Sequence, residues 1–166
     1  MDARGDYRPD QVVGLLGRHE VRYVLIGGLA AVTRGAPLVT QDVDVCHATD
    51  TANLTRLADA LREVSAGLRG ADPDLPFALD TRTLANGDAF TFTTDIGAID
   101  ILATPAGTGG YEDLARGADA FEMFGHRVLV ATIEDLIRMK RASGRIKDLL
   151  AVEELGALRD ELDGLS

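Results

Sequence analysis

Two aspartates, Asp42 and Asp44, stand one residue apart in a short segment rich in valine. The segment 41–47 has the length and composition of a β-strand, in which successive side chains point to opposite faces. Both carboxylates therefore project from one face, with their Cα atoms about 7 Å apart, and Val43 and Val45 enter a core on the other. The chain must form a sheet that buries one face of this strand and carries two like charges on the other.

Helical and strand-like segments alternate along the rest of the chain. Helices are expected over 10–20 (capped by Asp10), 29–32, 50–68 and 111–118 and from Thr132 onward, and strands over 21–26, 77–84, 89–94 and 98–103 and on both sides of Gly125. The pair Asn86-Gly87 predicts a hairpin between two of these strands, and segment 70–76, rich in Asp, Pro and Gly, is expected to be a loop. This order indicates an α/β or α+β domain with helices at both ends.

Composition limits the class of protein. The chain has 166 residues, 46% of them hydrophobic, which fits one domain over 1–166 with a sizeable core. No stretch approaches the roughly 18 apolar residues of a membrane helix, and the polar start lacks the apolar run of a signal peptide, so we expect a cytoplasmic protein with no membrane partner. A single cysteine cannot form a disulfide framework, and no Cys/His spacing indicates a zinc site.

The charge balance bears on phosphate chemistry. Seventeen basic residues against 27 acidic ones give a net charge of −10, which repels nucleic acid and acidic membranes on average. A protein of this charge that handles phosphates must neutralise them locally, with metal ions or with a concentrated basic patch.

A third carboxylate joins the first two. Asp100 lies between Ile99 and Ile101 in a strand that otherwise appears fully apolar. Three carboxylates from two neighbouring strands could hold one or two divalent cations, and oxygen ligands of this kind suit Mg²⁺ or Mn²⁺. By themselves, Asp-x-Asp pairs and single acids at strand edges are common, so the spacing alone also allows a purely structural reading.

A glycine pair, Gly27-Gly28, stands where a strand is followed by a short helix. Glycine has no Cβ, and backbone N–H groups at the start of a helix face outward, so a phosphate can approach closely there. Neither the dinucleotide-binding fingerprint nor a P-loop is present. Most glycine pairs are simply turns, and this one gains meaning from the acids that follow it.

Taken together, the stretch YVLIGGLAAVTRGAPLVTQDVDV resembles the nucleotidyltransferase (DNA polymerase β-like) superfamily. The resemblance spans about 22–155 and implies a nucleotidyltransferase fold, with a short mixed sheet, flanking helices and a C-terminal helical hairpin. The core would cover about 22–131 and the C-terminal helices about 132–163. The stretch IEDLIRMKRASGRIKDLLAVEEL resembles a narrower branch, the nucleotidyltransferase-like toxins of type IV toxin–antitoxin and abortive-infection systems.

The resemblance implies a metal-dependent transfer of a nucleoside monophosphate from an NTP to an acceptor, with release of pyrophosphate. Asp42, Asp44 and Asp100 would be catalytic and would bind Mg²⁺ or Mn²⁺, while Gly27 and Gly28 would hold the triphosphate. Thr40, in the Thr-x-Asp-x-Asp run, would join the nucleotide site. Relatives often carry a basic residue just before this run, where this chain has Leu38; Arg34 is the candidate to compensate.

A basic cluster lies near the C-terminus. The segment 138–147 holds five basic residues and no acid, namely Arg138, Lys140, Arg141, Arg145 and Lys147. Helical spacing places Lys140 on the apolar stripe, aimed at the protein body, where its ammonium could reach a triphosphate. Arg145 and Lys147 are further candidates for phosphate binding, and Asp148 is a candidate ion-pair partner. The alternative is a solvated amphipathic helix whose long cations reach into water.

Several acceptors and partners stay open at this stage. The toxin branch implies an RNA acceptor such as the 3′ end of a tRNA, or a protein acceptor, and a cognate antitoxin or toxin partner. Antibiotic-modifying enzymes share the core, so a small-molecule hydroxyl is an alternative acceptor. A non-catalytic module that binds nucleotide and acts through a partner is the competing hypothesis.

Overall fold

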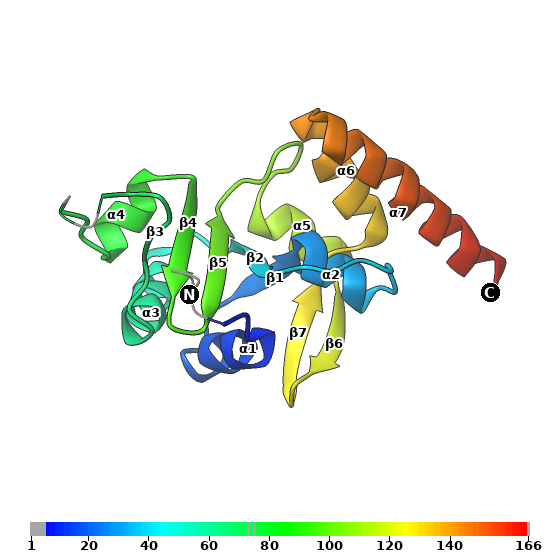
Figure 1. Ribbon diagram of the computed structural model, residues 1–166. Helices are drawn as coiled ribbons and strands as arrows, with labels where there is room; N and C mark the ends of the chain where they lie inside the picture. Colours follow the sequence, from blue (N-terminus) through cyan, green and yellow to red (C-terminus); the bar gives the residue numbers. More distant parts are fainter. Residues whose placement is uncertain (1–5, 73, 75, 166) are drawn as a thin grey trace.

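The computed structural model describes residues 6–72, 74 and 76–165, and a mixed seven-stranded sheet lies at its centre (Figure 1). The strands are β1 (Tyr23–Ile26), β2 (Asp42–His47), β3 (Gly67–Leu68), β4 (Ala89–Thr94), β5 (Gly97–Leu102), β6 (Asp119–Met123) and β7 (His126–Val130). Their spatial order is β3-β4-β5-β2-β1-β7-β6. The pairs β1–β7 and β2–β5 are parallel and the others antiparallel, so the expected mixed sheet is confirmed.

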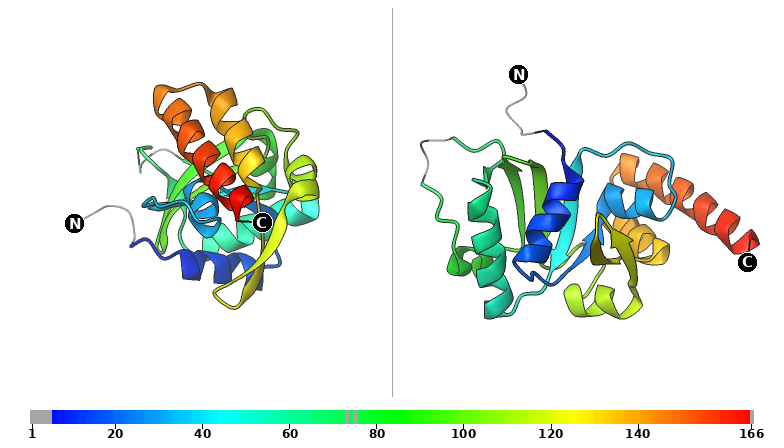
Figure 2. Two further views of the ribbon diagram at one scale, coloured as in Figure 1. Left: turned by 90° about the vertical axis from the view of Figure 1, so that its right-hand side faces the viewer. Right: turned by 90° about the horizontal axis from the view of Figure 1, so that it is seen from below.

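Helices flank this sheet (Figure 2). They are α1 (Pro9–Arg18), α2 (Gly27–Thr33), α3 (Thr51–Glu63), α4 (Thr81–Asn86), α5 (Tyr111–Gly117), α6 (Ile133–Ser143) and α7 (Ile146–Gly164). Of these, α1 packs against β2 and β7, α2 against β1 and β2, and α5 against β1. In the described part of the chain, no helix combines the length and apolarity needed to cross a membrane.

Strand β2 has the predicted alternation. Val43 and Val45 are buried in the core, whereas Asp42 and Asp44 on the other face are only partly buried. The parallel pairing with β5 sets Asp44 directly beside Asp100. The expectation that the three acids share one face of two neighbouring strands is therefore confirmed.

The predicted hairpin at Asn86-Gly87 is wrong. The segment 81–86 is helix α4, because the Asp80 side chain caps it by accepting a hydrogen bond from the Thr83 N–H at 2.8 Å. Strand β4 instead pairs with β5, joined by a tight turn at residues 95–96. Phe77, placed in a strand by its composition, packs its ring 6.3 Å from the rings of Phe90 and Phe92.

Other element bounds also differ from expectation. The helix predicted over 50–68 ends at Glu63, and Ser65 takes a positive φ of 54°, so that β3 can pair with β4. Helix α1 has Arg8 at its N-cap, and Asp10 lies in its first turn instead of capping it. Helix α2 begins at Gly27, earlier than predicted. Positions 73 and 75 of the predicted loop, and residues 1–5 and 166 of the predicted domain, lie outside the described residues.

The C-terminal helices form the expected pair. Thr132 caps α6 by accepting a hydrogen bond from the Asp135 N–H at 3.1 Å. Gly144 ends α6 in the left-handed region with a φ of 68°, which lets the chain reverse into α7. Helix α7 packs on α6 and extends beyond the sheet toward the C-terminus (Figure 1, Figure 2).

Candidate active site

A cleft of about 1110 Å³ opens between the sheet, the segment that follows α2, and the pair α6–α7. Eight of the nine residues singled out from the sequence line it: Gly27, Gly28, Asp42, Asp44, Asp100, Lys140, Arg145 and Lys147. The ninth, Thr40, lies beside Gly28, and its hydroxyl donates a hydrogen bond to the carbonyl of Asp42 at 3.2 Å. The structure thus brings together residues that are up to 120 positions apart (147 − 27 = 120).

The three carboxylates lie close enough to perturb one another. The pKa of Asp44 is raised to about 7 by burial, by a hydrogen bond to Asp100, and by the negative charges of Asp100 and Asp42; the ammonium of Lys140 opposes this shift. Asp42 has one carboxylate oxygen, Oδ1, that is buried without a hydrogen-bond partner. Leaving a buried acceptor unpaired costs about 1–3 kcal/mol, so this oxygen is suited to an electropositive ligand.

A divalent cation fits the donor chemistry of this group. It would pair the orphaned Oδ1 of Asp42 and relieve the repulsion that keeps a proton on Asp44, and carboxylate oxygens are ligands that Mg²⁺ prefers. As the side chains stand, no three His, Cys, Asp or Glu residues in the described ranges form a closed metal-binding cluster. Binding an ion would therefore require the carboxylates to turn from one another toward it.

Gly27 and Gly28 allow neighbouring side chains to approach the backbone so closely that a Cβ at either position would clash. Ile26 pairs with Asp44 across β1 and β2, so Gly27 follows directly beside this acid. A Cβ at Gly27 would lie 2.1 Å from Asp44 Oδ2, and the φ of +71° there favours glycine. A Cβ at Gly28 would lie 2.7 Å from Thr40 Oγ1. The two glycines, called the glycine cradle below, thus let the Asp44 and Thr40 side chains lie directly against the backbone next to the acids.

Two cations of the cleft, Lys140 and Arg145, are held by one buried acid. Asp148, whose side chain is only 2% exposed, accepts from Lys140 Nζ at 3.3 Å, Arg145 Nε at 2.7 Å and Ser143 Oγ at 2.5 Å. The hydrogen bonds from Ser143, Arg145 and Lys140 hold the pKa of Asp148 down at about 2. The expectation that Asp148 orients a basic residue is confirmed, and it orients two.

The pH dependence of stability is predicted from Asp148. Because its pKa is lower in the folded chain than the ordinary 3.8, its contribution is complete above pH 4 and is lost as the pH falls toward 2. We expect the wild type to lose about 1–2 kcal/mol more unfolding free energy between pH 5 and pH 3 than Asp148→Asn does. Urea titrations of both proteins at the two pH values measure this, and parallel losses would contradict it.

A third residue of the basic cluster, Arg138, is also paired with acids. Arg138 pairs with Asp113 at 3.0 Å and with Asp135 at 3.1 Å. With Lys140 and Arg145 bound to Asp148, three of the five basic residues of segment 138–147 have carboxylate partners. Lys147 lines the cleft, and Arg141 is exposed. The cluster contains no acid in sequence, but three acids lie against it in space: Asp113, Asp135 and Asp148.

Arg34 does not take the place of the missing basic residue at position 38. Its guanidinium donates to the carbonyls of Val130 and Ala131 at 2.9 and 3.1 Å and pairs with Asp119 at 2.9 Å. These contacts hold the side chain against β6 and β7, and Arg34 is not part of the cleft lining. Leu38 itself lines the cleft, which gives this wall an apolar surface.

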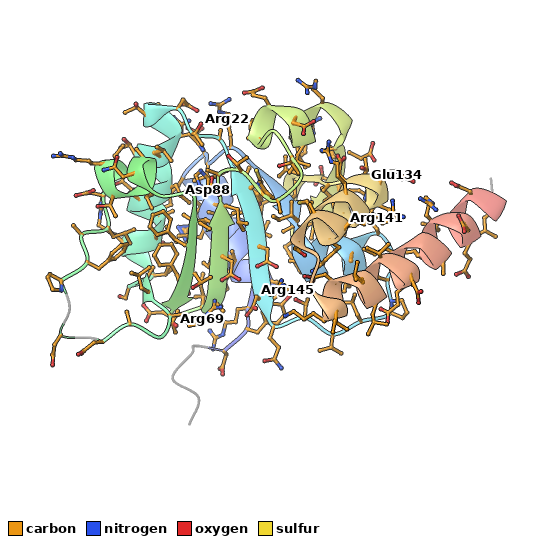
Figure 3. The ribbon with its side chains drawn as sticks, turned by 90° about the horizontal axis from the view of Figure 1, so that it is seen from above. Arg22, Arg69, Asp88, Glu134, Arg141 and Arg145 are labelled. Carbon is orange, nitrogen blue, oxygen red and sulfur yellow. The ribbon has the colours of Figure 1, made fainter. Side chains whose placement is uncertain are left out.

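Arg69 is a cleft residue that sequence reasoning missed. Its Nη2 donates to Asp100 Oδ1 at 2.8 Å and to the carbonyl of Phe92 at 3.0 Å. Arg69 follows β3, which was expected to be helix, so no spacing rule tied it to the acids. Figure 3 shows Arg69 and Arg145 at the same end of the sheet, with Asp88 at the opposite end.

Two solved structures of other proteins share this architecture. The lincosamide antibiotic adenylyltransferase LnuA, solved with lincomycin bound, matches with a TM-score of 0.60 over 93% of this chain and 99% of its own, at 12% identity. A candidate nucleotidyltransferase from Thermotoga maritima matches with a TM-score of 0.51 over 96% and 97% of the two chains, at 19% identity. The fold is that of the nucleotidyltransferases.

At these identities the likeness to the two nucleotidyltransferases concerns the fold. No protein-family model and no curated protein sequence matches the chain. The expected nucleotidyltransferase fold with a C-terminal helix pair is thus confirmed.

Proposed function

We propose that this protein is a metal-dependent nucleotidyltransferase that moves a nucleoside monophosphate from an NTP to an acceptor and releases pyrophosphate. The observation that carries the proposal is the convergence, in one cleft, of the glycine cradle, three carboxylates on one face of β2 and β5, and a lysine fixed beside them. The fold likeness to nucleotidyltransferases supports it.

Each group has a role that follows from its place. The backbone N–H groups at Gly27 and Gly28 would bind the triphosphate, with Thr40 shaping the floor beside them. Lys140 would neutralise the leaving pyrophosphate as charge builds on it, aided by Arg145 and Lys147 at the rim. Asp148 acts as a positioning residue, because it fixes the ammonium of Lys140.

The carboxylates would bind one or two Mg²⁺ or Mn²⁺ ions, which supply charge neutralisation for the transferring phosphoryl group. The acceptor oxygen forms a bond to the α-phosphorus, and the bond from the α-phosphorus to pyrophosphate breaks in line with it. Asp100 is the candidate to take the acceptor proton, because it lies at the open face of β5 with its side chain 18% exposed.

The acceptor we propose is the hydroxyl group of a small molecule. The basic cluster that would form an RNA footprint is mostly paired with Asp113, Asp135 and Asp148. Apolar side chains contribute to the cleft lining from two elements, with Leu38 in the segment after α2 and Leu158 in α7. LnuA, by its name, adenylylates lincosamide antibiotics, which are small molecules.

The other acceptors are second candidates. An RNA end such as that of a tRNA, or a protein, still fits the exposed Arg141 and the cleft-lining Lys147. A toxin–antitoxin partner stays a prediction from the sequence. The non-catalytic nucleotide-binding module is the competing function, and it predicts no consumption of NTP with any acceptor.

Label transfer distinguishes these acceptors. The protein is incubated with Mg²⁺ and each NTP labelled at the α-phosphate, against a panel of hydroxylated amphiphilic small molecules, bulk tRNA and an unrelated protein. We expect label on a small molecule, with equimolar pyrophosphate released. Label on tRNA or protein would overturn the acceptor class while keeping the reaction, and a folded protein that neither binds nor consumes any NTP would overturn the function.

The role of Lys140 gives a direct prediction. Lys140→Met removes the ammonium while keeping much of the apolar stem, so we expect the KM for NTP to rise by about 10- to 100-fold. Arg141→Met is the matched control, since Arg141 is exposed, lies one residue away and is not part of the cleft lining. Steady-state kinetics of the two variants measure the effect; equal KM values would contradict the role of Lys140.

A further inference from the structure

Arg69 places a permanent positive charge directly on the third carboxylate of the cleft. The Arg69 and Asp100 side chains are 25% and 18% exposed, and their 2.8 Å hydrogen bond lies at the cleft surface. The guanidinium is a planar cation whose geometry suits hydrogen bonds to a carboxylate. Asp100 is therefore already neutralised before any ligand enters.

The guanidinium is also held by groups other than Asp100. Nη2 donates to the carbonyl of Phe92 at 3.0 Å, whereas Nε is buried without a hydrogen-bond partner. The backbone N–H of Arg69 donates to the carbonyl of Thr91 at 2.9 Å, which fixes the residue to the edge of β4. Arg69 would therefore stay near Asp100 even when the carboxylate turns.

The three acids consequently differ in what they can offer a cation. One buried oxygen of Asp42 has no hydrogen-bond partner, and Asp44 lies close to the negative charges of its two neighbours. Asp100, in contrast, already accepts a hydrogen bond from the Arg69 guanidinium. A Mg²⁺ ion binds carboxylate oxygens at about 2.0–2.1 Å. An ion at Asp100 would have to share this carboxylate with the guanidinium, and two cations a few ångströms apart repel strongly at a partly buried site.

We propose that Arg69 takes the place of a second metal ion, so that the site binds one divalent cation, at Asp42 and Asp44, together with the nucleotide. This inference rests on the proposed function and specifies which positive charges would surround the nucleotide in the cleft. The guanidinium serves as the fixed cation on the Asp100 side of the transferring phosphoryl group. Arg69 is thus a residue that sets the metal stoichiometry.

Counting bound metal tests this without turnover. Mn²⁺ is titrated into the full chain saturated with an NTP analogue that cannot be cleaved between the α- and β-phosphates, and free Mn²⁺ is measured by electron paramagnetic resonance. We expect one bound Mn²⁺ per bound nucleotide in the wild type and two in Arg69→Met, because the freed Asp100 then accepts an ion. Arg116→Met, which removes an exposed arginine outside the cleft, is the control and should bind one.

The outcomes separate the inference from the function on which it rests. Two ions in the wild type, or one in a folded Arg69→Met, would overturn the inference and leave the function standing. No Mn²⁺ and no nucleotide bound to the folded wild type would overturn the proposed function itself. Asp100→Asn in the wild-type background is a second arm: the stoichiometry stays at one under our proposal, and a fall from two to one would contradict it.

Discussion

We expect Asp44→Asn to lower kcat for the proposed nucleotidyl transfer by at least about 1000-fold, equivalent to about 4 kcal/mol of transition-state stabilisation. The reason is its place: Asp44 lies between Asp42 and Asp100, beside the glycine cradle and near the ammonium of Lys140. Asparagine keeps the shape but removes the charge that would bind the cation. Initial rates of pyrophosphate release at saturating NTP measure the loss.

Stability provides the control for Asp44→Asn. The pKa of Asp44 is raised to about 7 from the ordinary 3.8, so the folded chain holds this proton more tightly than the unfolded chain does. In metal-free buffer the wild type therefore loses stability as the pH rises from 4 to 7, and the asparagine variant is spared this loss. We expect Asp44→Asn to be about 1–2 kcal/mol more stable than the wild type at pH 8. An inactive variant that is also unfolded, or a fully active one, would contradict the account.

We expect Gly27→Ala to weaken the proposed NTP binding by roughly 100-fold, or about 2.7 kcal/mol. The added methyl group would lie 2.1 Å from Asp44 Oδ2 and force an alanine to a φ of +71°, so both the carboxylate and the helix start must move. The same strain lowers the free energy of unfolding by about 1–3 kcal/mol. Calorimetric titration with NTP and Mg²⁺, combined with urea unfolding, measures both effects.

Gly156→Ala is the matched control for Gly27→Ala. Gly156 lies inside α7, where a Cβ would meet its nearest neighbour only at 4.0 Å, and it is not part of the cleft lining. Alanine is the better helix former, so this variant gains up to about 1 kcal/mol of stability. Its NTP affinity should equal that of the wild type. Equal weakening in both variants would mean that the cradle is not the binding site.

The acids and glycines of the cleft were predictable because they obey local rules. Alternation along a strand fixes the shared face of Asp42 and Asp44, and the isoleucines around Asp100 mark it as a strand residue. A glycine pair between a strand and a helix marks the cradle. Thr132 and the two acids that follow it in the first turn of α6 are a typical helix start, so the beginning of the C-terminal pair was also predictable from the sequence.

The errors arise where a local signal competes with a distant partner. Asn86-Gly87 is a strong turn signal, yet Asp80 caps α4 and the pairing of β4 with β5 is made at a different turn. Neither the ion pair of Arg69 with Asp100 nor the tie of Arg34 to Asp119 has a fixed spacing, and each joins segments brought together only by the sheet.

The basic cluster shows most clearly that the sequence alone does not reveal which charged side chains lie close together in space. Counted along the chain, segment 138–147 has five cations and no acid. In space, Asp113 comes from α5 and Asp148 from the first turn of α7, and both reach into the cluster. Arg138, Lys140 and Arg145 are therefore engaged in ion pairs within the protein, and one of these pairs positions Lys140. This pairing is one reason why we propose a small acceptor over an RNA.

Calorimetric titration of the four NTPs, with and without Mg²⁺, tests the central claim most directly, because it requires no knowledge of the acceptor. We predict Mg²⁺-dependent binding of at least one NTP to the wild type, and at least roughly 100-fold weaker binding to Asp44→Ala. Binding that is equal in the variant and independent of Mg²⁺, or no binding of any NTP to the folded wild type, would contradict the account and favour the interaction module.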